Sequence, residues 1–254
     1  MSRLADRLKH MCRLLGYVAS HPTSVATFTG PSFAEFVKLS QIHKDGWGLC
    51  LVDGSHAKLQ KSSEIAATSE SFANIVENEN SSGGLLHFRW ATPGIEVNDL
   101  NAHPFTYKDV GFIHNGALSP YDALLPEISE EFLSLRRGSG DSELFFLFAL
   151  TKIEQLGFVQ GVLETIRSIK KSYDYSSINS MFLNSDFLIV VSEHHPDNRP
   201  SWGEPDYYEV RYRLDGSGCL VASSGWSQEG WALMPNHSAL IIDRKTMKGE
   251  LINL

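Results

Sequence analysis

The sequence predicts an α+β fold in which antiparallel sheets and helices pack together in one domain. Segments rich in β-forming residues lie towards the two ends of the chain, and the two strongest helical patterns follow one another between them. This grouping differs from the steady strand–helix alternation of a parallel, doubly wound sheet. The 254 residues suffice for one large domain or two small ones, and no low-complexity linker or internal repeat divides them.

The N-terminal part of the domain is expected to form short strands and one helix. The strands combine β-forming residues with glycines at their ends. The helix, residues 31–41, has Pro31 in its first turn and Phe33, Phe36 and Val37 on one face, as an amphipathic helix does. The four expected strands are residues 13–20, 43–54, 83–92 and 109–118.

The C-terminal part is expected to begin with two helices and to continue with strands. Residues 141–157 contain a long apolar run that ends at the helix-stopping Gly157. Residues 157–173 are expected to form a second helix for the same reasons. A polar, proline-containing loop follows at residues 194–206. The expected strands are residues 180–193, 207–214, 219–224 and 238–243.

Composition argues against several classes of partner. The formal net charge of -8 argues against nucleic acid, because a nucleic-acid-binding surface normally carries a basic stripe. No apolar run approaches the roughly 18 residues of a membrane-spanning helix, so no membrane partner is expected. The N-terminus lacks the apolar core of a secretory signal, which predicts a cytoplasmic location.

No metal or other cofactor is expected. The three cysteines, Cys12, Cys50 and Cys219, lack the CxxC spacing of a zinc site and are too few for a disulfide framework. The histidines are too scattered in the sequence to suggest a set of metal ligands.

The dipeptide Met11-Cys12 has two interpretations. As an internal residue, Cys12 would be a small apolar side chain in the core. If the working chain begins at Cys12, this residue carries both a thiol and a free α-amine. Their ordinary pKa values, about 8.5 and about 7.7–8.0, allow the amine to accept the thiol proton near neutral pH. The nucleophile would then use its own terminus as the base.

Two charged residues are candidates for binding a substrate. Arg89, in the stretch HFRWATPG, could clamp a carboxylate with its planar guanidinium, or it could form a structural ion pair. Asp141, just before the strongest helical pattern, could bind an ammonium, or it could cap that helix. Together the two residues would recognise the head of an amino acid.

The pair Asn115-Gly116 is either a tight hairpin turn or an oxyanion hole. In the second interpretation, the Asn amide and the Gly backbone N–H point at the same place. A cysteine beside an oxyanion hole makes an acyl-transfer site. A substrate with an amino-acid head and an amide tail satisfies all of these residues, and glutamine is such a substrate.

Six stretches together resemble the motifs of class II glutamine amidotransferases, in the same order. They are MCRLLGY, HKDGWG, HFRWATPG, NAHPF, FIHNGAL and GDSE, and the rest of the chain resembles the stand-alone, YafJ-type branch of this family. The resemblance implies an N-terminal-nucleophile (Ntn) hydrolase with a four-layer αββα sandwich of two antiparallel sheets. It also implies that Cys12 attacks the side-chain amide and forms a γ-glutamyl thioester, while Asn115 and Gly116 hold the oxyanion.

The resemblance assigns substrate recognition to four residues. Arg89 would bind the α-carboxylate, with help from the backbone near Thr92, Asp141 would bind the α-ammonium, and Trp90 would wall the pocket. Other residues of the motifs are expected to be scaffold: Asp45, Trp47, His103 and His114. Pro93 stands where many relatives that make amino sugars have histidine, which weakens the transfer of a contact from that position.

Residues 1–11 would be an extension or leader that the active protein lacks, and residues 12–254 would be the amidotransferase domain. The expected substrate is glutamine or a γ-glutamyl conjugate, with a separate synthase as a potential partner for the released ammonia. Two alternatives remain open. One is an amidase with an N-terminal cysteine that acts on non-glutamyl amides. The other is a catalytically silent binding or regulatory subunit that retains the extension.

Overall fold

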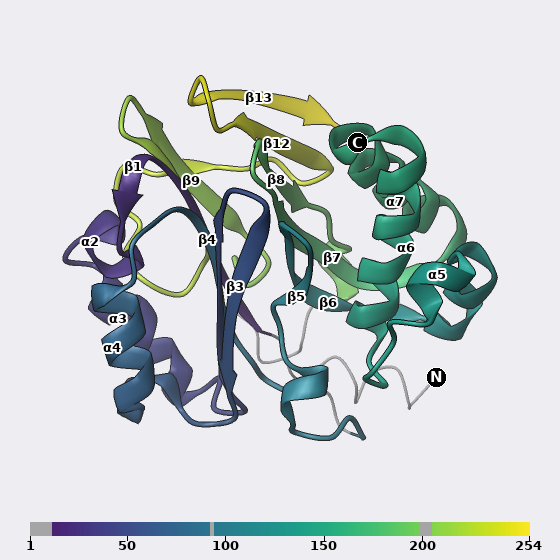
Figure 1. Cartoon of the computed structure of the whole chain (residues 1–254), viewed down its shortest axis with the longest axis horizontal. Helices are drawn as coiled ribbons and strands as arrows, with labels where there is room; N and C mark the ends of the chain where they lie inside the picture. Colours follow the sequence, from purple (N-terminus) through teal and green to yellow (C-terminus); the bar gives the residue numbers. More distant parts are fainter. Residues whose placement is uncertain (1–11, 92–93, 199–204) are drawn as a thin grey trace.

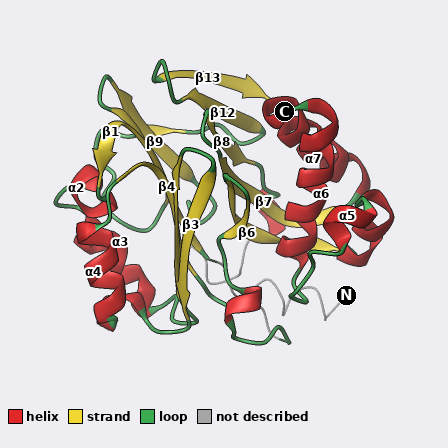
Figure 2. Ribbon diagram, in the orientation of Figure 1, coloured by secondary structure: helices red, strands yellow, loops and turns green. Residues whose placement is uncertain are grey.

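The computed structural model describes residues 12–91, 94–198 and 205–254, which form four stacked layers (Figure 1). Two sheets face each other in the centre, and a group of helices covers the outer face of each sheet (Figure 2). Every pairing of neighbouring strands is antiparallel. The predicted four-layer αββα sandwich of two antiparallel sheets is therefore confirmed.

Each sheet is described by its strands in spatial order. The seven-stranded sheet contains β11 (Ala232–Leu233), β9 (Val210–Asp215), β10 (Gly218–Ser223), β1 (Arg13–Thr23), β4 (Ser81–Phe88), β2 (Trp47–Asp53) and β3 (His56–Ser62). The six-stranded sheet contains β13 (Lys248–Asn253), β12 (Ser238–Asp243), β8 (Phe187–Ser192), β7 (Asp174–Leu183), β6 (Val110–Ser119) and β5 (Phe105–Tyr107).

The helices fall into two groups. The seven-stranded sheet packs against α2 (Val25–Thr29), α3 (Phe33–Lys38) and α4 (Glu70–Asn78). The six-stranded sheet packs against α5 (Glu130–Leu133), α6 (Asp141–Leu156) and α7 (Phe158–Ser172). Short 3-10 turns complete the described elements: η1 (Leu39–Gln41), η2 (Ala66–Thr68), η3 (Asp99–Asn101), η4 (Tyr121–Glu127) and η5 (Pro196–Asn198). No helix in the described ranges is long and apolar enough to cross a membrane.

Strand β1 illustrates how the core is divided. Leu15, Tyr17 and Ala19 belong to the core between the seven-stranded sheet and its helices, whereas Leu14 and Val18 belong to the core between the sheets. Successive side chains of a strand point to opposite faces, so a strand covered on both faces is apolar throughout rather than alternating with polar residues.

The structure corrects several predicted strand boundaries, and two of the corrections bear on the fold or the site. The strand predicted at 83–92 ends at Phe88, so Arg89 and Trp90 follow β4. The strand predicted at 180–193 is a hairpin, in which β7 turns at residues 184–186 into β8. Asn184 drives the break, because its Oδ1 accepts the backbone N–H groups of Asp186 and Phe187.

Helix α4 was not predicted, although its sequence contains the signals. Ser69 caps the helix, since its Oγ accepts the N–H of Phe72. Phe72, Ile75 and Val76 then lie on one face and are buried. The helix has only nine residues, and polar residues separate the apolar ones, so the apolar stripe is too short to stand out in the sequence.

Candidate active site

The expected site residues come from four elements that meet at one end of the sheets. Strand β1 starts opposite the end of β4, with Arg13 paired to Phe88. This register places Cys12, which precedes β1, beside Arg89 and Trp90, which follow β4. Asn115 and Gly116 lie in β6, and Asp141 is the first residue of α6.

Cys12 is partly buried and lies between two segments of the site. Its Sγ is 3.5 Å from the backbone N–H of Trp90, and its own backbone N–H donates to Oδ1 of Asn115 at 2.9 Å. Burial raises the pKa of the thiol to about 11, against the opposing effects of the Trp90 backbone and the Arg89 and Arg13 charges. The thiol therefore needs a base to react near neutral pH.

Asn115 and Gly116 do not form the hairpin turn that their sequence also allowed. Both lie within β6, next to an irregularity in the β6–β7 register between Gly116 and Leu118. Because Oδ1 of Asn115 accepts the Cys12 N–H, its Nδ2 is directed away from that contact. Gly116 is required by space, since a Cβ there would lie 1.7 Å from the carbonyl oxygen of Ser177.

Arg89 is buried and only partly satisfied. Its Nη2 donates to the carbonyl oxygen of Glu96 at 3.0 Å. Its Nη1 is buried and has no hydrogen-bond partner among the described residues. Unpaired buried donors are uncommon in proteins, so an anion bound at Arg89 would supply the missing acceptor. The alternative of a structural ion pair is not found in the described ranges.

Asp141 does not occupy the N-cap position that its sequence also allowed. Gly140 is the cap residue of α6, and Asp141 is the first helical residue. Its Oδ2 accepts the N–H of Leu118 at 2.9 Å, and its Oδ1 accepts the N–H of Ser142 at 2.9 Å. These bonds join α6 to the end of β6 and hold the carboxylate at the edge of the site.

One pocket with about 480 Å³ of empty space, part of it open to solvent, contains six of the seven predicted site residues. Its lining comprises Cys12, Arg89, Trp90, Ile95, Asn101, His103, Phe105, His114, Asn115, Gly116, Gly140, Asp141 and Ser142. The seventh residue, Thr92, lies outside the described residues, as does Pro93. A thiol, an amide donor and two opposite charges therefore face a common space.

Three histidines form a buried layer beside the pocket. The rings of His87 and His103 lie 4.3 Å apart, and those of His103 and His114 lie 6.4 Å apart. Burial holds the pKa of His87 and of His103 well below the ordinary value and lowers that of His114. The layer is therefore neutral near pH 7, and its members do not add positive charge to the pocket.

Asp45 and Trp47, from the motif HKDGWG, do not line the pocket. Oδ2 of Asp45 accepts the N–H of Ala91 at 2.7 Å, which fixes the segment after β4. Trp47 is buried against Phe72, with 5.2 Å between the ring centroids.

Among the residues described, no group of three histidine, cysteine or acidic side chains is arranged to hold a metal ion.

Sequence reasoning missed two residues that organise the site. Arg13 donates to the carbonyl oxygen of Cys12 at 3.2 Å and stacks on the ring of Tyr207 at 4.5 Å. Asn101, the first residue of the stretch NAHPF, lines the pocket beside Arg89. The motifs that contain these residues were visible in the sequence, but Arg13 contacts Tyr207 and Asn101 contacts Ser139, both far away along the chain.

The chain is similar to known proteins in both sequence and structure. The family model for class-II glutamine amidotransferases matches residues 11–195. A putative glutamine amidotransferase of Haemophilus influenzae is 28% identical over 194 residues, which are 72% of this chain and 63% of that protein. The putative glutamine amidotransferase YafJ of Escherichia coli is 30% identical over 194 residues, covering 71% of this chain and 72% of that protein.

A solved structure shares the fold. The glutamine aminotransferase class-II domain protein of Silicibacter pomeroyi superposes with a TM-score of 0.67 at 19% identity, covering 95% of this chain and 99% of that one. This likeness concerns the fold alone, whereas the family match rests on sequence and includes the motifs that line the pocket. The chain belongs to the class-II glutamine amidotransferases.

Proposed function

We propose that this protein hydrolyses the side-chain amide of glutamine, or the γ-glutamyl amide bond of a larger conjugate, with Cys12 as the nucleophile. The observation that carries the proposal is the shared pocket. Cys12 and Asn115 line it together, with the backbone N–H of Cys12 donating to Oδ1 of Asn115 at 2.9 Å. Arg89, after β4, and Asp141, at the start of α6, supply opposite charges to the same pocket. Such an arrangement suits a substrate with an amide at one end and a zwitterionic head at the other.

The first half of the reaction transfers the acyl group to sulfur. The α-amine of Cys12 accepts the thiol proton, and the sulfur attacks the amide carbon. The Asn115 Nδ2 and the backbone N–H of Gly116 stabilise the negative oxygen of the tetrahedral intermediate. The protonated amine then gives its proton to the leaving nitrogen, the carbon–nitrogen bond breaks, and ammonia or an amine departs from a γ-glutamyl thioester.

Water completes the reaction. The α-amine takes a proton from the water molecule as its oxygen attacks the thioester carbon. The carbon–sulfur bond breaks, the sulfur recovers a proton, and glutamate leaves the pocket. Both halves use the same oxyanion donors, because a negative oxygen develops at the same carbonyl each time.

Recognition of the head follows from the charges. The unpaired Nη1 of Arg89 would bind the α-carboxylate, with help from the backbone near Thr92. The carboxylate of Asp141 would bind the α-ammonium, and Trp90 would form a wall of the pocket. The ammonia either leaves to solvent or passes to a separate synthase.

The proposed mechanism requires a free α-amine on Cys12. A peptide bond between Met11 and Cys12 would turn this amine into an amide, which cannot act as the base. We therefore infer that residues 1–11 are absent from the active protein and that residues 12–254 form the catalytic domain.

Replacement of the nucleophile tests the proposal. Protein that begins at Cys12, as shown by intact mass, is expected to release ammonia from glutamine or glutamate from γ-glutamyl amides. Cys12→Ala is expected to abolish this release, because no other thiol lines the pocket. Cys50→Ala is the matched control, since it removes a thiol that is buried between the two sheets and does not line the pocket.

Two outcomes would contradict the proposal. Unchanged turnover by Cys12→Ala would exclude Cys12 as the nucleophile. Unchanged KM in both Arg89→Lys and Asp141→Asn would show that the amino-acid head is not recognised, which would favour an amidase for non-glutamyl amides. A cellular protein that begins at Met1 and is inactive would favour the regulatory subunit.

A further inference from the structure

The two residues proposed to bind the substrate head come from segments that are far apart in the sequence. Arg89 follows β4, and Asp141 is the first residue of α6. No hydrogen bond or ion pair joins these two side chains directly. Their separation must nevertheless match that of the α-carboxylate and the α-ammonium, which sit on one carbon atom of the substrate.

The side chain of Asn101 connects the two segments. Its Nδ2 donates to the carbonyl oxygen of Glu96 at 3.3 Å, and the same oxygen accepts from Nη2 of Arg89 at 3.0 Å. Its Oδ1 accepts the N–H of Ser139 at 2.9 Å, two residues before Asp141. One amide therefore contacts both the carbonyl that holds the guanidinium and the segment that carries the carboxylate.

The approach of the two segments is close and depends on glycine. A Cβ on Gly138 would lie 2.6 Å from Oδ1 of Asn101 and 2.9 Å from the carbonyl oxygen of Leu100. A larger residue at position 138 would push the segments apart, because both of these distances are too short for a real Cβ contact. The chain thus provides both the connecting amide and the space for it.

The segment around Asn101 and the segment before α6 are each also held by hydrogen bonds to a neighbouring strand or helix. Nζ of Lys61, on β3, donates to the carbonyl oxygens of Asp99 and Ala102 at 3.1 and 2.6 Å, on either side of Asn101. The buried carboxylate of Glu143, on α6, accepts the N–H groups of Arg137 and Gly138 at 2.9 and 2.6 Å. Asn101 therefore joins two anchored segments and is held at a defined position between them.

We propose that Asn101 is a positioning residue, which sets the spacing between Arg89 and Asp141 and thereby selects substrates with a free α-amino-acid head. This inference rests on the proposed function. The amide is suited to the task because it offers a donor on one side and an acceptor on the other. Asp at this position would keep the acceptor for Ser139 but lose the donor and place an oxygen against the Glu96 carbonyl. The hydrogen bond from Asn101 to the Glu96 carbonyl, which also holds Arg89, would therefore be lost, whereas the hydrogen bond from Ser139 would remain.

Steady-state kinetics on protein that begins at Cys12 tests this role. Asn101→Asp is expected to raise KM for glutamine by roughly tenfold, the usual effect of one lost hydrogen bond to a buried group, while kcat changes by less than about threefold. Asn184→Ala is the control, because the Asn184 side chain also makes two hydrogen bonds to backbone groups, accepting two N–H groups, but lies in the β7–β8 turn. It should leave KM unchanged.

Substrate analogues separate positioning from general damage to the pocket. Glutaramate keeps the carboxylate of glutamine and lacks the ammonium, so Asn101→Asp should impair its hydrolysis as it does for glutamine. The compound 4-aminobutanamide lacks the carboxylate, so its kcat/KM should be the same in Asn101→Asp and wild type. Equal losses for both analogues, or an unchanged KM for glutamine, would overturn the proposed role.

Failure of the proposed function would be recognised separately. A wild-type protein that begins at Cys12 and releases no ammonia from glutamine would overturn that function. Calorimetric binding of glutamate, the product that carries the same head, would still decide the role of Asn101. Binding weakened roughly tenfold by Asn101→Asp would support it, whereas equal binding, or none in the wild type, would overturn it.

Discussion

The reactivity of Cys12 depends on what is attached to its nitrogen. In the intact chain this nitrogen is a peptide N–H that donates to Asn115, and burial raises the pKa of the thiol to about 11. A thiol with this pKa is almost entirely protonated at pH 7. In the proposed mechanism, a free amine on the same residue would supply the base.

The pH dependence of activity should reveal this amine. In protein that begins at Cys12, kcat/KM for glutamine is expected to rise with pH and to level off above about pH 8, because the amine acts only when deprotonated and its ordinary pKa is about 7.7–8.0. Protein that retains residues 1–11 should be at least about 10²-fold less active near pH 7, since it lacks the base. Ammonia release by the two forms, each verified by intact mass, checks both statements, and equal activity would contradict them.

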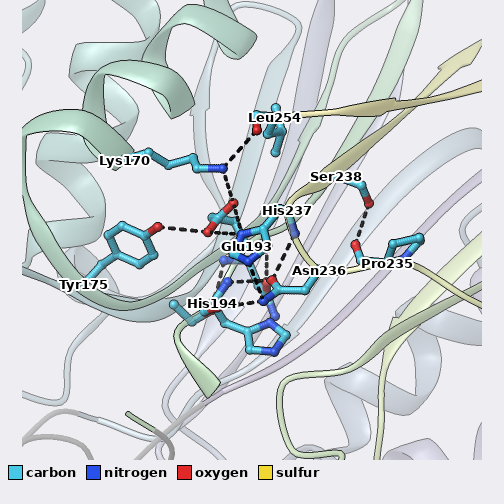
Figure 3. Close-up of polar contacts among 11 residues, drawn as sticks. Lys170, Tyr175, Glu193, His194, Pro235, Asn236, His237, Ser238 and Leu254 are labelled. Atoms are coloured by element: carbon cyan, nitrogen blue, oxygen red, sulfur yellow. Dashed lines mark hydrogen bonds and ion pairs between the residues drawn. The ribbon is translucent and has the colours of Figure 1, made fainter. Parts of the chain in front are cut away.

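At the scale of elements, a buried carboxylate connects the helical layer to the six-stranded sheet. Glu193, which follows β8, accepts from Lys170 on α7 at 2.7 Å, from Tyr175 on β7 at 2.8 Å and contacts Nδ1 of His237 at 2.8 Å. Figure 3 shows these side chains converging on Glu193. Lys170 also donates to the carbonyl oxygen of Leu254 at 3.1 Å, so the same cluster holds the end of the chain.

Loss of the Glu193 charge should destabilise the protein. Glu193→Gln is expected to lower the free energy of unfolding by about 3 kcal/mol. The substitution leaves Lys170 without its buried counter-ion and places a neutral amide beside the ammonium group. Urea denaturation measures this change. Glu154→Gln is the control, since Glu154 is exposed on α6 and a surface substitution should cost less than about 0.5 kcal/mol. Equal midpoints for the two variants would contradict the expectation.

At the scale of the whole molecule, Arg244 connects the two sheets. It follows β12 of the six-stranded sheet, and its Nη2 donates to the Val52 carbonyl oxygen and to Oγ of Ser82, both at 2.9 Å, in the seven-stranded sheet. Its Nη1 donates to the carbonyl oxygen of Asn184. Ser82 lies near the start of β4, whereas Arg89 follows its end, so this connection is at the opposite end of the sheets from the pocket.

Removal of this connection should affect stability without affecting the site. Arg244→Met is expected to lower the free energy of unfolding by about 3 kcal/mol, since it leaves buried acceptors without their donor. Thermal and urea denaturation measure the loss, and KM for glutamine should not change. Arg167→Met, at an exposed position of α7, is the matched control. A large rise in KM for Arg244→Met would show that the pocket depends on the far end of the sandwich.

The sequence by itself determined the fold class and the candidates for the reactive groups. The strands of the sandwich core and the two long helices could be predicted because β-forming composition and helical periodicity are local properties. Cys12, Arg89, Asn115 and Asp141 could be selected because thiol, guanidinium, amide and carboxylate each have their own chemistry. Helix α4 was missed because its apolar stripe is short, and its burial depends on the sheet beneath it.

Only the tertiary structure decided which of these groups meet and in what state. The β1–β4 register places Cys12 beside Trp90, and the placement of Asn115 in β6 excludes the hairpin turn that an Asn-Gly pair also favours. The raised pKa of Cys12 and the connection made by Asn101 both arise between segments distant in the chain. Desolvation and contacts between loops depend on what surrounds a residue in space, and neighbours along the chain do not specify those surroundings.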